Sequence, residues 1–440
     1  MKRPLSVILT TIEYPPQSFS SGIGSYTKAI AEGLAARGHR VHVLTRGTDR
    51  NAIERQDDVS VEFVIPARAD LPTNLKSTAS MLALGVRGAA GELRYRRRLA
   101  RRIHELVAND GFELVESADH MGEAAWYDPS RHPGVPYVVR LHTPMTYSEE
   151  AERIVPTWVG ALAASQERRQ VRHATHLSSP SAAMVPAVLK SLHATGRPVH
   201  VFPNPNLVGA GSAAPLSDPA GPPVVLFVGR LTGWKGVDTL VRAVPQVLSR
   251  YPQARFQLVG SDPGAASGHA SYRSHLESLL PASTLGSVEF VGKVPHDELE
   301  GYYTRATVCV FPSRFDVQPY TCLEAMSYGK AIIGSTPSGM RDMLEEGAAG
   351  LLHDPPDVED LASKLLTLLG DPELRRRLGA RAFERVRTVF STERALEATE
   401  EFYARAIDEL RGQRQNQART NARPRAGGRL TGTDGSHVAD

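Results

Sequence analysis

The sequence predicts an α/β protein of two doubly wound domains, each built on a parallel β-sheet. Short apolar runs alternate with segments of helical spacing along most of the chain, which is the pattern of repeated βα units. This alternation stops at residues 207–223, a stretch rich in Gly, Ala, Ser and Pro, and then restarts. The chain has 440 residues, of which 41% are hydrophobic, and this is enough for two cores.

The first βαβ unit lies near the start of the chain. Residues 5–10 form an apolar run typical of a buried strand, and a Gly/Ser-rich loop follows at 18–25. The next residues have helical spacing up to Gly38, and residues 41–46 form a second strand. Four further strands are predicted in this half: 61–65, 113–117, 136–141 and 200–204. Their hydrophobic runs favour a parallel sheet covered on both faces.

The same alternation restarts at residue 224. Predicted strands in this half are 224–230, 255–260, 288–292, 307–313 and 330–335. Helical patterns occur at 236–251, near 270–280, and at 296–306, 322–329 and 357–370. We therefore expect an N-terminal domain over 1–206, a linker over 207–223, a C-terminal domain over 224–391 and a C-terminal helix over 392–411. The basic segment 412–440 has few large apolar residues and is predicted to be disordered.

Composition excludes several classes of protein. The formal net charge of +3 does not indicate a nucleic-acid partner. The two cysteines, Cys309 and Cys322, have no metal-binding spacing and do not make a disulfide framework. The N-terminus lacks a convincing signal peptide, and no stretch approaches the roughly 18 apolar residues of a membrane helix. We expect a cytoplasmic protein whose oligomeric state the sequence does not indicate.

Two glycines, Gly22 and Gly24, open the first predicted helix. The N-terminus of a helix presents unpaired N–H groups and a positive dipole end, and glycines let an anionic ligand approach the backbone. A dinucleotide fingerprint would place a third glycine at position 27, where the chain has Thr27. The pattern therefore indicates either an anion site or only a tight βα turn.

A pair of cations follows the first strand of the second half. Arg230 comes directly after the strand, and Lys235 stands five residues later at the start of a helix. A planar guanidinium and a flexible ammonium in this position could neutralise a diphosphate. The alternative interpretation is a solvated pair of surface charges.

Asp316 and Glu324 lie at the two ends of a loop that leads into a helix. Two carboxylates in such a place can accept hydrogen bonds from the vicinal hydroxyls of a sugar or a ribose. The helix start beside them would offer backbone N–H donors to phosphate, and these belong to Tyr320, Thr321, Cys322 and Leu323. The alternative is an ordinary turn residue and an ordinary helix acid. His142 lies at the end of the apolar strand 136–141, and ligands bind at such strand ends in open parallel sheets. A lone histidine can also be structural.

Together these segments resemble the retaining glycosyltransferases of family 4, which have the GT-B fold. The resemblance rests on the N-terminal glycines, the strand-end histidine, GRLTGWKG (229–236) and PYTCLEAMSYGKAIIGS (319–335), in this order. It covers about residues 5–410 and is strongest in the C-terminal half. It implies two Rossmann-like domains that face each other across a cleft, with the nucleotide sugar held mainly by the second.

The resemblance also implies roles for individual residues. Glu324 would bind the ribose hydroxyls, Asp316 the hydroxyls of the transferred sugar, and His142 would sit beside the donor sugar and the acceptor. Arg230 and Lys235 would clamp the diphosphate, which Gly22 and Gly24 would approach from the other domain. The chain departs from the family pattern at two places. Asp316 replaces the usual Glu, and Gln318-Pro319 replaces a Phe-Gly or Phe-Pro pair.

The expected function is the transfer of a hexose-type sugar from a nucleotide diphosphate sugar, with UDP favoured, to an acceptor hydroxyl. The chain has no Asp-x-Asp pair, so cationic side chains and helix dipoles would replace a metal ion, and no cofactor is expected. Front-face transfer with retention, in glycan, polysaccharide or secondary-metabolite synthesis, follows from the resemblance. The alternatives are a UDP-sugar epimerase, a nicotinamide-dependent oxidoreductase and a non-catalytic nucleotide-sugar binder.

The acceptor is expected to bind the N-terminal domain. Glu116, Asp119 and His120 follow a predicted strand there and are the candidate acceptor-binding residues. The acceptor would be a glycan, a lipid-linked sugar or a small molecule. The basic segment 93–102, if helical, could contact an anionic membrane surface, and the alternative is a solvated helix face.

Overall fold

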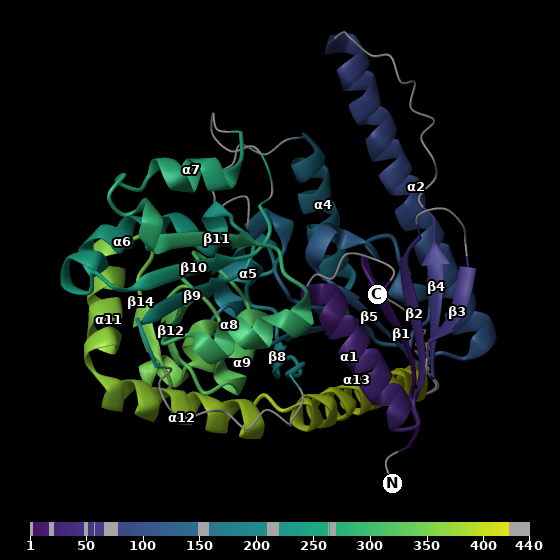
Figure 1. Cartoon of the computed structure of the whole chain (residues 1–440). Helices are drawn as coiled ribbons and strands as arrows, with labels where there is room; N and C mark the ends of the chain where they lie inside the picture. Colours follow the sequence, from purple (N-terminus) through teal and green to yellow (C-terminus); the bar gives the residue numbers. More distant parts are fainter. Residues whose placement is uncertain are drawn as a thin grey trace, which may run out of the picture.

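The computed structural model describes the residue ranges 3–16, 22–47, 52–56, 58–65, 78–147, 158–208, 220–262, 264 and 270–421. These residues form two α/β halves, each with its own parallel sheet, joined along one side by the C-terminal helices (Figure 1). The parts of the predicted glycine loop, linker and tail that fall at 17–21, 209–219 and 422–440 lie outside the described residues.

Among the described residues, the N-terminal sheet has eight strands in the order β3-β4-β2-β1-β5-β6-β7-β8. β3 is antiparallel to β4, and the other neighbouring pairs are parallel. The strands are β1 (Ser6–Thr11), β2 (Arg40–Arg46), β3 (Ala52–Gln56), β4 (Val59–Val64), β5 (Leu114–Ala118), β6 (Tyr137–Arg140), β7 (His176–Ser179) and β8 (His200–Val201).

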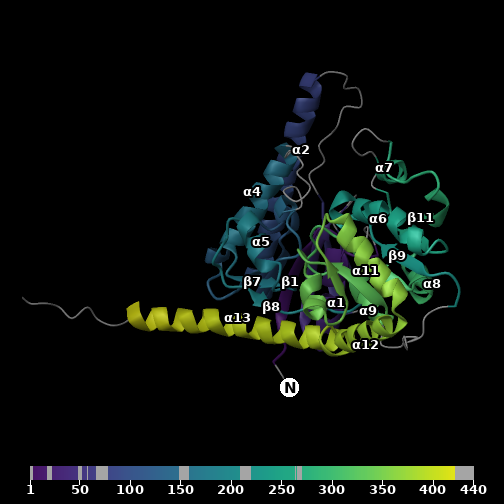
Figure 2. The same cartoon turned by 90° about the vertical axis from the view of Figure 1, so that its left-hand side faces the viewer.

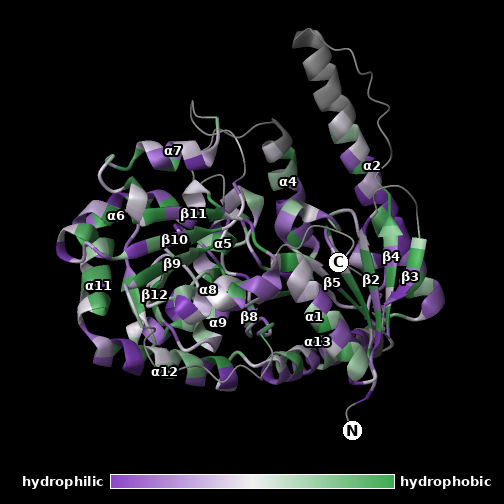
Figure 3. Cartoon of the chain, viewed as in Figure 1, coloured by the Kyte–Doolittle hydropathy of each residue, from purple (hydrophilic) through white to green (hydrophobic). Residues whose placement is uncertain are grey.

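Helices cover both faces of this sheet. The helices α2 (Thr78–Asp110), α4 (Trp158–His173) and α5 (Val185–Ser191) share one apolar core with the sheet. The helices α1 (Gly22–Ala36) and α13 (Thr392–Asn421) share the core on the other face. The strands are coloured as hydrophobic and the outer helix faces as largely hydrophilic (Figure 3), as the sequence pattern predicts.

The described C-terminal sheet has six parallel strands in the order β11-β10-β9-β12-β13-β14. The strands are β9 (Val224–Val228), β10 (Arg255–Val259), β11 (Val288–Gly292), β12 (Val308–Val310), β13 (Ala331–Ser335) and β14 (Leu351–His353). On one face lie α6 (Val237–Arg250), α7 (Tyr272–Ser278) and α11 (Val358–Gly370). On the other lie α8 (Leu299–Arg305), α9 (Tyr320–Ser327), α10 (Met340–Met343) and most of α12 (Pro372–Thr388).

Two doubly wound domains were predicted, and the structure confirms them. Two boundaries differ from the prediction. The helix α1 already begins at Gly22, so both predicted loop glycines lie in its first turn. A Cβ at Gly24 would lie 3.0 Å from the main-chain oxygen of Glu13, so a side chain there would require a small shift of the Glu13 backbone. The helix α13 continues to Asn421, ten residues beyond the predicted end at 411.

The helix α13 returns from the C-terminal half and packs on the N-terminal sheet (Figure 2). Leu396, Phe402 and Tyr403 of this helix are buried beside α1. A Cβ at Gly33 of α1 would meet the Leu396 side chain at 2.5 Å, which shows how closely the two helices approach. Because α13 follows α12 of the C-terminal half and packs on the N-terminal half, these two helices connect the halves at the side of the molecule.

Candidate active site

The predicted site residues lie on loops, in the first turns of helices and, for Glu116, within a strand, near the carboxyl ends of the strands of both sheets. In doubly wound folds these ends are where ligands bind. The two halves meet through the first turns of α1 and α9, because a Cβ at Gly22 would lie 3.6 Å from the Tyr320 ring. The structure therefore brings the predicted N-terminal glycines next to the predicted donor residues of the C-terminal half.

Lys235 and Asp316 form an ion pair across the loops that follow β9 and β12. The Lys235 Nζ atom donates a hydrogen bond to Oδ2 of Asp316 at 2.5 Å, and both side chains are largely buried. Gly236 makes this approach possible, because its φ is +68° and a Cβ there would lie 1.8 Å from the Pro312 carbonyl oxygen. The predicted diphosphate cation and the predicted sugar-binding acid thus contact each other.

Trp234 lies between the two predicted cations. The Lys235 ammonium is 4.3 Å, and the Arg230 guanidinium carbon 5.3 Å, from the centre of the Trp234 ring. The indole stacks on Phe315, with ring centroids 5.3 Å apart. Phe315 in turn packs into the N-terminal core beside Tyr147. The aromatic pair therefore supports both cations at the junction of the two halves.

The first turn of α9 does not offer all four of the predicted donors. The N–H groups of Cys322 and Leu323 already bond to the Pro319 carbonyl, at 3.1 and 3.3 Å. Their side chains are fully buried in the C-terminal core. Tyr320 and Thr321 are half-buried at the start of the helix. Their N–H groups precede the first intrahelical hydrogen bonds of α9. Pro319, which precedes the helix, has no N–H group. The N–H donors at this end of the helix are therefore those of Tyr320 and Thr321.

Glu324 is the fifth residue of α9, and its carboxylate is buried. The Tyr303 hydroxyl donates a hydrogen bond to Oε2 at 2.7 Å, and His296 Nδ1 lies 3.9 Å from Oε1. Burial raises the pKa of Glu324, while Tyr303 and His296 oppose this change. One carboxylate oxygen is thus fixed by a tyrosine and the other faces an exposed histidine.

His142 stands at the end of β6 and is buried against α1. Its ring lies edge-on to Tyr26, with centroids 4.8 Å apart, and Nε2 has no hydrogen-bond partner among the described residues. Its main-chain N–H donates to Oδ1 of Asp119 at 3.0 Å. Burial, with Arg140 and His120 nearby, holds the pKa of His142 well below its usual range, so the ring is neutral at pH 7.

Asp119 and His120 follow β5 and lie beside the His142 loop. The Asp119 carboxyl is fully buried, and burial raises the pKa of Asp119 to about 8. The ring Nδ1 of His120 is 3.0 Å from the Thr143 carbonyl oxygen, which can only accept, so Nδ1 carries the proton. His120 helps to line a small recess, which we call the β1–β5 recess; its lining residues are Thr10, Thr11, Ile12, Ile23, Ala118, His120 and Glu123.

Glu116 is not among the residues that line this recess, and its predicted contact with an acceptor stays a prediction. Its side chain points from β5 toward α1, where the Tyr26 hydroxyl donates to Oε1 at 3.0 Å. It is only 3% exposed, and burial raises the pKa of Glu116. Side chains alternate along a strand, so a strand-end acid faces either the core or the site, and the sequence did not distinguish the two.

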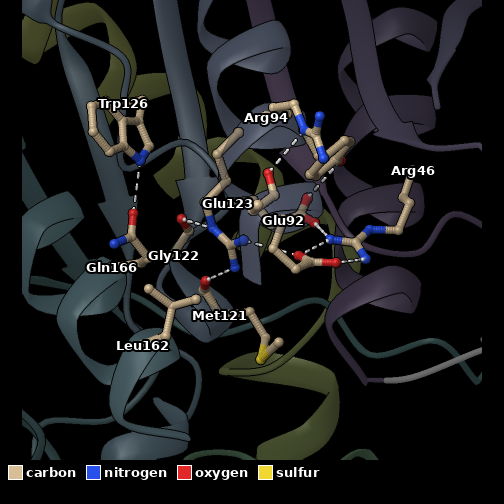
Figure 4. Close-up of polar contacts among 12 residues, drawn as sticks. Arg46, Glu92, Arg94, Met121, Gly122, Glu123, Trp126, Leu162 and Gln166 are labelled. Carbon is tan, nitrogen blue, oxygen red and sulfur yellow. Dashed lines mark hydrogen bonds and ion pairs between the residues drawn. The ribbon is translucent and has the colours of Figure 1, made fainter. Parts of the chain in front are cut away.

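Glu123 lines the β1–β5 recess, and no sequence motif indicated it. It is nearly buried, receives a 3.3 Å hydrogen bond from Tyr95 and lies 3.5 Å from Arg46. Burial raises the pKa of Glu123 to about 7. Figure 4 shows Glu123 close to the Arg46–Glu92 ion pair. The structure therefore places Glu123, rather than Glu116, beside His120.

Arg96, within the basic segment 93–102, is buried and bonds to this same region. Its guanidinium donates to the carbonyl oxygens of Met121 and Gly122, at 2.8 and 3.1 Å. Figure 4 shows these two carbonyls, with the Glu92 carboxylate on the other side. At least one arginine of the basic segment thus holds the loop after β5, which the periodicity of the sequence did not reveal.

The described residues contain no group of three or more His, Cys, Asp or Glu side chains that could hold a metal ion. Within the same residues, no helix is long and apolar enough to cross a membrane.

The fold is that of a two-domain GT-B glycosyltransferase. The protein-family model described as "Glycosyl transferase 4-like domain" matches residues 21–205, and the one described as "Glycosyl transferases group 1" matches residues 213–385. The chain belongs to this family of glycosyltransferases, and it is a transferase enzyme, as predicted.

Curated relatives match almost the whole chain. "Glycogen synthase" of Mycobacterium tuberculosis is 26% identical over 430 residues, which cover 94% of this chain and 97% of that protein. "D-inositol 3-phosphate glycosyltransferase" of Kineococcus radiotolerans is 28% identical over 443 residues, covering 93% and 96%.

Solved structures show the same fold. Sucrose-phosphate synthase from Thermosynechococcus elongatus superposes with a TM-score of 0.69 at 23% identity, covering 92% of this chain and all of that chain. The Anabaena protein HepE, in complex with UDP, has a TM-score of 0.64 at 17% identity, covering 91% and 100%.

Proposed function

We propose that this glycosyltransferase moves a hexose-type sugar from a nucleotide diphosphate sugar to an acceptor hydroxyl, with retention and without a metal ion. One observation carries the proposal: Gly22 of the N-terminal half lies beside Tyr320 at the start of α9, near the loops that hold Lys235 and Asp316. A helix start and cations gathered at the carboxyl ends of two parallel sheets suit a diphosphate. UDP is the first nucleotide to test, since the Anabaena neighbour was solved with UDP.

In this mechanism Lys235 and Arg230 stabilise the charge that develops on the leaving diphosphate. Lys235 is then shared between the phosphate and Asp316, and the ion pair holds its ammonium in place before the donor binds. Glu324 accepts hydrogen bonds from the ribose hydroxyls, and its bond from Tyr303 fixes the orientation of the carboxylate. The start of α9 supplies the remaining partial positive charge.

The acceptor hydroxyl attacks the face of the sugar from which the diphosphate leaves, and a phosphate oxygen takes its proton. The new glycosidic C–O bond forms as the bond to the diphosphate breaks. Because the His142 ring is neutral at pH 7, it supports an oxocarbenium-like transition state as a dipole or through its main chain, not as a cation. The β1–β5 recess, with His120 and Glu123, is the acceptor side of the site.

The test is a transfer assay with purified protein, a panel of nucleotide sugars and simple acceptors, followed by NMR of the anomeric proton. The proposal predicts a product with the anomeric configuration of the donor and an unchanged rate in EDTA. Inversion of the anomeric configuration would contradict the mechanism, and loss of activity in EDTA that Mg²⁺ restores would contradict metal independence. An epimerised nucleotide sugar formed without any acceptor would favour the alternative reaction.

A further inference from the structure

Glu167, in the middle of α4, is a fully buried carboxylate that the sequence did not single out. It accepts four hydrogen bonds. Oε1 accepts from the main-chain N–H groups of Met121 and Met145, at 2.9 and 2.7 Å. Oε2 accepts from the main-chain N–H and the hydroxyl of Thr146, at 3.1 and 2.6 Å. A buried carboxylate requires such partners. Here they lie in the segments that follow β5 and β6, with Met121 in a 3-10 turn and Met145 and Thr146 at the start of a helix.

The four donors belong to the two loops that carry the N-terminal site residues. Met121 follows His120 directly, and Met145 and Thr146 follow His142 by three and four residues. The loops are also bonded to each other, through the His142 N–H to Asp119 and through His120 to the Thr143 carbonyl. Glu167 therefore holds both loops at once.

The loop after β5 needs such an anchor because its backbone is strained. Met121 has φ +63°, in the left-handed region that a non-glycine residue rarely adopts. Its N–H bonds to Glu167 and its carbonyl to Arg96, so both sides of this residue are held. The next residue, Gly122, lies so close to α4 that a Cβ would be 2.4 Å from the main-chain carbon of Gln166. The loop is thus pressed onto the helix turn that carries Glu167.

We propose that Glu167 is a positioning residue for sugar transfer, which acts through the two loops on His120 and His142 without contacting either substrate. The inference rests on the proposed function, because His120 and His142 matter for transfer only if the reaction takes place there. The ionisable groups near Glu167 that face the same segments include Asp119, one residue before His120, and Arg96, which bonds to the Met121 carbonyl. Loss of the Glu167 charge is expected to make the positions of the His120 and His142 side chains less well fixed, both at once.

The experiment compares Glu167→Gln with Gln166→Met in the full-length protein. The neighbouring Gln166 is also buried and accepts a 2.9 Å hydrogen bond from Trp126 (Figure 4), and its side chain takes no part in the four hydrogen bonds from Met121, Met145 and Thr146. The Gln variant replaces one accepting oxygen with an NH₂ group that faces an N–H donor. We expect kcat to fall about 100-fold, the effect of a misplacement near 1 Å, with an unchanged Kd for UDP. Gln166→Met should keep kcat even where its melting temperature falls.

A readout that does not need turnover separates this inference from the proposed function. The ring NMR signals of His120 and His142 should shift in Glu167→Gln and stay in place in Gln166→Met. If wild-type protein transfers no sugar, the proposed function fails, and these signals still decide whether Glu167 holds the loops. Unchanged ring signals, or a kcat loss of equal size in both variants, would overturn the inference. If Glu167→Gln does not fold, Thr146→Val removes one of the four bonds, and the same shifts, smaller in size, are expected.

Discussion

Single residues explain where this chain differs from the pattern that its sequence resembles. The side chain of Gln318 accepts the Asn204 N–H at 2.9 Å and donates to the Asn204 carbonyl at 3.4 Å. An amide can make this paired contact with a main chain, and an aromatic side chain cannot. Asp316, one methylene shorter than Glu, meets Lys235. Both departures are thus used in contacts between segments that are distant in the sequence.

Asp119 is expected to make the stability of the protein depend on pH. Its folded-state pKa of about 8 lies above its ordinary value of 3.8, so between these values the folded state binds more protons. Its contribution to stability is therefore fully present below the ordinary value and is lost as pH rises through 8. The loss is at most about 1.4 kcal/mol for each pH unit. Asp119→Asn imitates the protonated acid and keeps the acceptor for His142.

Thermal unfolding of both proteins from pH 5 to 9 measures this effect. We expect the melting temperature of wild-type protein to fall relative to that of Asp119→Asn as the pH rises from 6 to 9. The conservative variant Asp128→Asn, at an exposed helix cap, serves as the control. Parallel curves for wild type and Asp119→Asn across this range would contradict the raised pKa of Asp119.

At the scale of elements, α2 serves two purposes. Arg96 and Arg102 face inward, where they bond to the loop after β5 and to Glu62. Arg98 and Arg101 are exposed on the same helix. In Figure 1 the N-terminal part of α2 extends beyond the rest of the N-terminal half. Contact between the basic segment 93–102 and an anionic membrane stays a prediction, and only its outward arginines can make it.

Flotation with phosphatidylglycerol vesicles tests this membrane contact. Each exposed arginine near such a surface contributes about 1 kcal/mol, so Arg98→Ser/Arg101→Ser should weaken binding about 30-fold. The double variant Arg376→Ser/Arg377→Ser on α12 removes the same charge from another exposed helix and should bind as wild type does. Absence of wild-type binding, or equal loss in both variants, would show that the segment is a solvated helix face.

Elements with strong patterns were predictable, and those defined by tertiary contacts were not. The apolar runs of β1, β9 and β13 identified these strands, because a strand buried on both faces is hydrophobic throughout. The edge strand β3 (AIERQ) and the three-residue β14 lack such runs and were missed. In the site, Lys235 and Glu324 stood in recognisable segments. Glu123 and Glu167 act through partners 20 to 80 residues away in the chain, such as Arg46 for Glu123 and Met121 and Thr146 for Glu167, and no local pattern encodes such contacts.

At the scale of the molecule, the two halves are joined at several points around the site. Asp342 accepts hydrogen bonds from the Ser181 hydroxyl and the Ala183 N–H, at 2.6 and 3.0 Å. Arg37, directly after α1, pairs with Glu400 of α13. These contacts, with Gln318 and Asn204, place the carboxyl ends of one sheet against those of the other. The central claim is that this junction holds a nucleotide sugar.

The most direct test of this claim is calorimetric titration with UDP, GDP, ADP, dTDP and NAD. It compares wild-type protein with Glu324→Ala and with Glu300→Ala, which removes an exposed carboxylate from α8. The account predicts that one nucleoside diphosphate binds, that Glu324→Ala weakens binding at least about 10-fold through lost charge-assisted bonds, and that Glu300→Ala changes nothing. Binding of NAD alone, or equal affinity in wild type and Glu324→Ala, would contradict the account.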